Sequence, residues 1–133
     1  MKNIKILIVD NPLIALDLLD RIEHLQELGK FAQVSSLDFV DHITGQEAIK
    51  HFERDQPDIA FIEVGVGANI EGVHTAMAIR EKSNLPIIFL VFDQQQVDET
   101  RKVSEPIFHL EKPFLMRQID RAMNSALISL NNS

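Results

Sequence analysis

The sequence predicts an α/β protein, a three-layer α/β/α sandwich in which helices cover both faces of a parallel sheet. Several apolar runs lack polar alternation, as is typical of strands that are buried on both faces. Amphipathic segments with apolar residues at helical spacing lie between these runs. Runs and segments alternate about five times each, and this rhythm indicates parallel strands joined by right-handed helical crossovers.

The composition is that of one globular domain. The chain has 133 residues, 45% of them hydrophobic and 25% charged, and no cysteine, which excludes disulfide scaffolds and thiolate sites. Its net charge of -7 repels nucleic acid and anionic lipid, so we expect neither partner. The longest apolar run, residues 85–92, is far short of the ~20 residues that a membrane span needs. The start lacks a secretory cleavage pattern, so we expect a cytoplasmic protein.

The first half of the chain contains two strand–helix units and a third strand. Residues 4–9 form a β-branched run, and Pro12 suits the first turn of the amphipathic helix that follows. We place the second strand at residues 37–43. The sequence from Thr44 to Glu47 has capping-box spacing and begins the second helix. A further buried strand follows at residues 59–64.

The second half continues the alternation. Its predicted elements are a glycine-rich loop at 65–72, a helix around 73–80, a strand at 85–92, a polar helix at 93–103, a strand at 107–111 and a closing helix around 119–126. We expect one domain over residues 1–127. Residues 128–133 are expected to form a C-terminal tail that extends the last helix or starts a linker to an output domain outside this chain.

Charged residues gather at the predicted carboxyl ends of the strands, where function collects in parallel α/β sheets. Asp10 and Asn11 follow the first strand, Glu63 ends the third, and Lys112 follows the fifth. The surrounding segments resemble, in order and spacing, the response-regulator receiver domain over residues 4–127. The matching segments are ILIVD at 6–10, PDIAFIE at 57–63, EGV at 71–73, LPIIFL at 85–90 and KPF at 112–114. The resemblance implies a CheY-like domain, with a five-stranded parallel sheet of flavodoxin-like order 2-1-3-4-5.

The resemblance also implies a set of site positions. In the family, two acids after the first strand hold Mg²⁺, and an aspartate at the end of the third strand accepts a phosphoryl group from a histidine kinase. Here the acceptor position is Glu63, and the acidic pair is Asp10 with the neutral Asn11. The extra methylene of Glu63 misplaces its oxygen for in-line transfer. We therefore expect no catalytic residue and no cofactor, with Mg²⁺ bound weakly at most through Asp10.

The family's switch positions are replaced as well. Val91 stands where a hydroxyl normally contacts the phosphoryl group, and His109 stands where an aromatic side chain reports the change. His109 is either a pH-sensitive substitute for that aromatic or a satisfied structural histidine. Lys112 keeps the family residue, and we expect it to pair with Glu63, since either charge buried alone is costly. That pairing either mimics the phosphorylated state or is a salt bridge in a site that no longer accepts a phosphoryl group.

These substitutions predict an atypical receiver, or pseudo-receiver, of a two-component phosphorelay. We expect it to act through contacts with a protein partner, a histidine kinase or a downstream effector, without the usual aspartyl phosphate. The alternative is a receiver that retains weak Mg²⁺-dependent phosphoryl acceptance. A third hypothesis places a nucleotide or small metabolite at the loop after Glu63. The face formed by residues 94–126 is mixed in charge and permits a homodimer.

Overall fold

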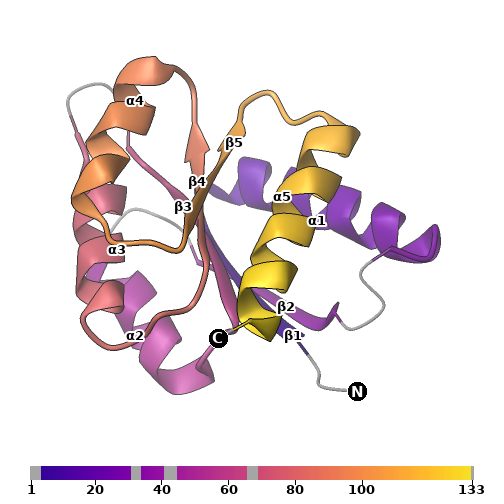
Figure 1. The fold of residues 1–133 in the computed structure, drawn as a ribbon, viewed down its shortest axis with the longest axis horizontal. Helices are drawn as coiled ribbons and strands as arrows, with labels where there is room; N and C mark the ends of the chain where they lie inside the picture. Colours follow the sequence, from indigo (N-terminus) through magenta and orange to yellow (C-terminus); the bar gives the residue numbers. More distant parts are fainter. Residues whose placement is uncertain (1–3, 31–33, 41–44, 66–68, 133) are drawn as a thin grey trace.

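Among the residues that the structure describes, five strands and five α-helices alternate (Figure 1). The computed structural model describes residues 4–30, 34–40, 45–65 and 69–132, with the backbone alone for 34–40. In order, the elements are β1 (Ile4–Val9), α1 (Pro12–Glu27), β2 (Val34–Val40), α2 (Gly45–Asp55), β3 (Ile59–Glu63), α3 (Glu71–Arg80), β4 (Ile87–Val91), α4 (Gln94–Glu99), the 3-10 helix η1 (Thr100–Lys102), β5 (Ile107–Glu111) and α5 (Met116–Asn131). The predicted α/β class is confirmed.

The strands form one sheet in the order β2-β1-β3-β4-β5, and every neighbouring pair is parallel. The chain runs outward from β1 to β2 and then returns to place β3 on the other side of β1. Val9 pairs with Ile62, so the residues that follow β1 lie beside the end of β3. This reversal of strand order opens the crevice at which parallel α/β sheets hold their functional groups.

Several element boundaries differ from the predicted ones, and those of β2 and β4 bear most on the site. The strand β2 begins at Val34, three residues before the predicted start, because it pairs along the whole length of β1 from Ile4 onward. Residues 41–43 of the predicted strand, and Thr44 of the predicted capping box, lie outside the described residues. The strand β4 ends at Val91, so Phe92, although part of the same apolar run, lies beyond it and is 55% exposed.

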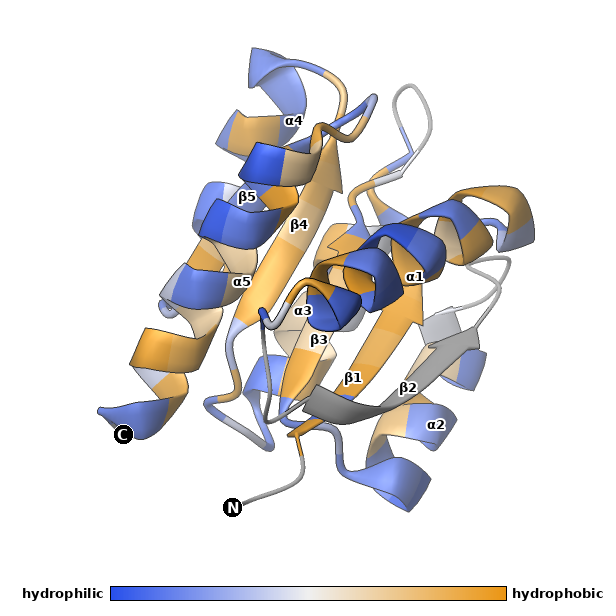
Figure 2. Ribbon diagram, turned by 90° about the vertical axis from the view of Figure 1, so that its right-hand side faces the viewer, coloured by the Kyte–Doolittle hydropathy of each residue, from blue (hydrophilic) through white to orange (hydrophobic). Residues whose placement is uncertain are grey.

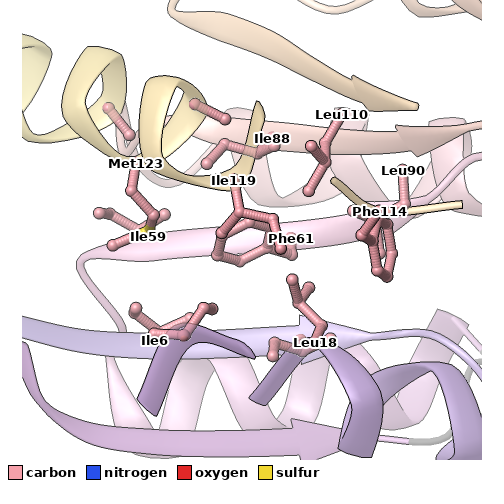
Figure 3. Close-up of a cluster of buried hydrophobic side chains, with 14 of the residues drawn as sticks. Ile6, Leu18, Ile59, Phe61, Ile88, Leu90, Leu110, Phe114, Ile119 and Met123 are labelled. Carbon is pink, nitrogen blue, oxygen red and sulfur yellow. The ribbon is translucent and has the colours of Figure 1, made fainter. Parts of the chain in front are cut away.

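The sheet has an apolar core on each face. On one face α1 and α5 pack against alternate residues of β1, β3 and β4, and Figure 3 shows this cluster, with Phe61 at its centre and Leu18 and Met123 on either side. On the other face α2 and α3 cover the intervening residues of the same strands. Because both faces are covered, β1, β3 and β4 are almost entirely apolar, as Figure 2 shows.

The last helix, α5, continues beyond residue 126. Residues 128–131, which were expected either to extend this helix or to start a linker, continue it to Asn131. The reason is that Leu127 is buried and Leu130, nearly one turn later, packs against the same core cluster. Among the described residues, no helix is both long and apolar enough to cross a membrane.

Candidate functional site

Three charged side chains meet at the carboxyl edge of the sheet. Asp10 follows β1, Glu63 ends β3, and Lys112 follows β5, and all three are buried, with exposures of 0%, 4% and 7%. The Lys112 ammonium donates a hydrogen bond to Glu63 Oε2 at 2.7 Å. The same ammonium makes an ion pair with Asp10 Oδ2 at 2.8 Å, without hydrogen-bond geometry. We call these residues the carboxylate–lysine triad.

The backbone around the triad fixes where its side chains lie. The Lys112 N–H donates to the Val91 carbonyl at 2.8 Å, which ties the turn after β5 to the end of β4. The other Asp10 oxygen, Oδ1, accepts a hydrogen bond from the Asn11 N–H at 2.6 Å. The start of α3 lies directly against the end of β3, where a Cβ at Gly72 would collide with the Glu63 carbonyl. Glycine at this position is therefore required by the close approach.

The triad contains two carboxylates but only one cation. Burial raises the pKa of Asp10 from 3.8 to about 7, and hydrogen bonding with Glu63 acts in the same direction. The Lys112 ammonium opposes this rise without cancelling it. Below pH 7, Asp10 therefore holds a proton. Ionisation of Asp10 leaves a net negative charge in a buried site, which is unfavourable.

The residues of this site do not fit a magnesium ion. Mg²⁺ needs near-octahedral oxygen ligands and usually one or two free carboxylates. Here Asp10 and Glu63 both contact the Lys112 ammonium. The Asn11 side chain is committed as the N-cap of α1, where its Oδ1 accepts the Ile14 N–H at 2.9 Å. Within the described part of the chain, no group of three or more acidic or histidine side chains is arranged to hold a metal.

The side chains of the two predicted switch positions make their recorded contacts outside the triad. Val91 is 3% exposed and contributes its side chain to the core. His109 lies on β5, stacks on Phe89 with 6.2 Å between ring centroids, and contacts the Thr100 hydroxyl through Nε2 at 2.7 Å. That hydroxyl donates its hydrogen to the Val97 carbonyl, so His109 donates from Nε2.

Desolvation lowers the pKa of His109, and Glu105 acts in the opposite direction. At neutral pH the ring is therefore uncharged and hydrogen-bonded. His109 thus has a hydrogen-bond partner, although the residue is exposed.

Sequence reasoning missed two residues beside the triad. The Phe92 ring lies over the Lys112 ammonium, with Nζ 4.8 Å from the ring centroid, in a cation–π contact. Gln96 connects the loops that follow β3 and β4 through its side-chain amide. A signal was available for Gln96, because Asp93 and Gln96 have the spacing of a capping box at the start of α4. Phe92 was taken for a strand residue, and nothing in the sequence separates it from β4.

The loop after β3 was the predicted place for a small ligand. Residues 66–68 of that loop lie outside the described residues. A groove of about 770 Å³ occurs at the opposite, amino-terminal edge of the sheet, between Pro57, Leu85 and Leu130. That groove is remote from the triad, so it lends no support to a ligand at Glu63.

No protein-family model matches the chain. Solved structures do, among them the signal receiver domain of a modulated diguanylate cyclase from Desulfovibrio desulfuricans G20, with 25% identity and a TM-score of 0.72 over 98% of both chains. A two component transcriptional regulator AraC from Clostridium phytofermentans ISDg matches with 18% identity and a TM-score of 0.79, over 98% of this chain and 97% of that one. The anti-anti-sigma factor PhyR from Bartonella quintana matches with 21% identity and a TM-score of 0.75, over 99% of this chain and half of that one.

These similarities confirm the resemblance to response-regulator receiver domains at the level of the fold. The match extends over almost the whole chain in each case. The chain therefore has the receiver fold, with the carboxylate–lysine triad at the edge of the sheet where the resemblance places the phosphoacceptor site.

Proposed function

We propose that this chain is a receiver-type signalling module that acts through protein contacts without taking up a phosphoryl group at Glu63. The observation that carries the proposal is the position of the Lys112 ammonium, which contacts both carboxylates of the site. A phosphoryl group on Glu63 would have to displace this buried ion pair. The same contacts leave the site no free carboxylate for Mg²⁺, which neutralises charge in phosphoryl transfer.

Incubation with Mg²⁺ and acetyl phosphate, followed by intact-mass measurement, tests the proposal. We expect no phosphoryl adduct on the wild-type protein, and an adduct on Glu63 or Asp10 would refute it in favour of weak acceptance. The matched positive control is the variant Asn11→Asp, Glu63→Asp, Val91→Thr, which restores the residue types that the resemblance implies. The variant should gain an adduct under the same conditions.

The same triple variant gives an independent prediction about the metal. Shortening Glu63 withdraws its oxygens from Lys112, and Asp at position 11 adds a second acid beside Asp10, so Mg²⁺ affinity should become measurable. Isothermal titration calorimetry checks this against the wild type, for which we expect no heat of binding. If neither protein binds Mg²⁺, the backbone of the site, and not its side chains, prevents binding.

Two further parts of the proposal concern partners. The charge of -7 supports a protein partner over nucleic acid or an anionic membrane. The partner in this proposal is a histidine kinase or a downstream effector. A homodimer through residues 94–126 is tested by light scattering over a range of protein concentrations. A mass that stays at one chain throughout would argue against it.

A further inference from the structure

The side-chain amide of Gln96 joins the segment that directly follows β3 to the loop between β4 and α4. Its Oε1 accepts the Phe92 N–H at 2.6 Å, in the loop between β4 and α4. Its Nε2 donates to the Gly65 carbonyl at 3.0 Å, just after β3. Gln96 is itself held at the start of α4, because the N-cap Asp93 accepts its backbone N–H at 2.9 Å. One side chain thus connects the strand end that carries Glu63 to the residue that covers Lys112.

The position of Phe92 needs such a connection. The ring lies 4.8 Å from the buried Lys112 ammonium on one side, yet the residue is 55% exposed. Hydrophobic burial therefore holds this ring only in part, and a cation–π contact at a half-exposed ring is weak. On its N-terminal side the neighbouring residue, Val91, is fixed in the core. The Phe92 backbone itself is fixed by Gln96.

We propose that Gln96 is a positioning residue that clasps the loops after β3 and β4 and so keeps the Phe92 ring as a lid over the carboxylate–lysine triad. The inference deepens the proposed function and rests on it only for its consequence: a lid held closed limits access of phosphodonors and ions to Glu63. The lid itself is a matter of loop geometry and can be tested without any phosphodonor.

Glutamine suits this task because it combines an acceptor and a donor in one group. A glutamate at position 96 keeps an acceptor for the Phe92 N–H but sets a carboxylate against the Gly65 carbonyl. A methionine has a similar length and forms neither hydrogen bond. Gln95 is the matched control, since it neighbours Gln96 on α4 and is exposed. The variants Gln96→Met, Gln96→Glu and Gln95→Met therefore separate the clasp from helix propensity.

Hydrogen exchange of the Phe92 amide, followed by NMR, reports the first half of the clasp. A net hydrogen bond of ~1 kcal/mol corresponds to roughly a fivefold change in local opening, so Gln96→Met should speed exchange by about that factor. Gln96→Glu should retain most of the protection, and Gln95→Met should match the wild type. Equal exchange in Gln96→Met and Gln95→Met would overturn the clasp.

Acylation of Lys112, measured by peptide mass spectrometry against the exposed Lys102, reports the lid. We expect Lys112 to react several times faster in Gln96→Met than in Gln95→Met. Phe92→Ala removes the ring while leaving the backbone contact, so it should raise Lys112 reactivity without exposing the amide at position 92. Unchanged Lys112 reactivity in both variants would overturn the lid even if the amide exchange changes. A failed proposed function would instead appear as a wild-type phosphoryl adduct.

Discussion

Replacement of Asp10 by asparagine should change how the free energy of unfolding depends on pH. In the wild type the pKa of Asp10 rises from 3.8 in the unfolded chain to about 7 in the folded one. Between these two values the folded state binds more protons than the unfolded state, so this carboxyl makes stability fall as pH rises. This loss of stability is complete above about pH 7, and the Asp10→Asn variant does not undergo it.

The structure also gives the expected magnitude. Over the whole interval the carboxyl accounts for roughly 4 kcal/mol, of which about 2 kcal/mol falls between pH 5.5 and 8.5. The asparagine amide must set its NH₂ group against either the Asn11 N–H or the Lys112 ammonium, which now surround the Asp10 oxygens. We therefore expect the variant to be less stable than the wild type at pH 5.5 and to close or reverse that deficit by pH 8.5.

Urea unfolding followed by far-ultraviolet circular dichroism measures this difference, since the chain has no tryptophan or tyrosine to report by fluorescence. The control is Asp20→Asn, an exposed aspartate on α1 whose variant should run parallel to the wild type at every pH. A difference between Asp10→Asn and wild type that stays constant from pH 5.5 to 8.5 would refute the conclusion that Asp10 is protonated below pH 7.

Four further substitutions, of which Gly29→Ala is a control, follow from the contacts in the structure. Lys112→Met leaves two buried carboxylates without their cation and should lower the unfolding free energy by ~3–5 kcal/mol in urea titrations, less at low pH than at high pH. Gly72→Ala places a Cβ against the Glu63 carbonyl and should prevent stable folding. The control is Gly29→Ala, where φ is +86° and the space around the residue is open. This variant should lower the free energy of unfolding by only ~1 kcal/mol. The Arg80 guanidinium donates hydrogen bonds to four backbone carbonyls, those of Ser83, Leu85, Ser104 and Pro106. Arg80→Met removes this donor and should lower the free energy of unfolding by ~2–3 kcal/mol in urea titrations. An unchanged midpoint of urea unfolding would contradict this role.

Local sequence patterns were sufficient for the alternation of elements and for the residues of the triad. Apolar runs such as residues 59–63 identify strands covered on both faces, because a strand with one solvent-exposed face would alternate apolar and polar residues. Residues that directly follow such strands must reach the same edge of a parallel sheet, so Asp10, Glu63 and Lys112 could be brought together from spacing alone. The replacement of the family's acceptor aspartate by Glu63 is likewise visible in the sequence itself.

Only the tertiary structure decided the contacts between segments that lie far apart in the sequence. The sharing of Lys112 between two carboxylates, and the resulting pKa of Asp10, follow from burial and contact geometry that no local pattern encodes. The bounds of β2 were set by pairing with β1, and the exposure of Phe92 was set by where β4 stops pairing. Hydrophobic periodicity shows which side of a helix or strand is buried. The partner that a polar side chain finds across 31 residues, as Gln96 finds Gly65, is a property of the assembled fold.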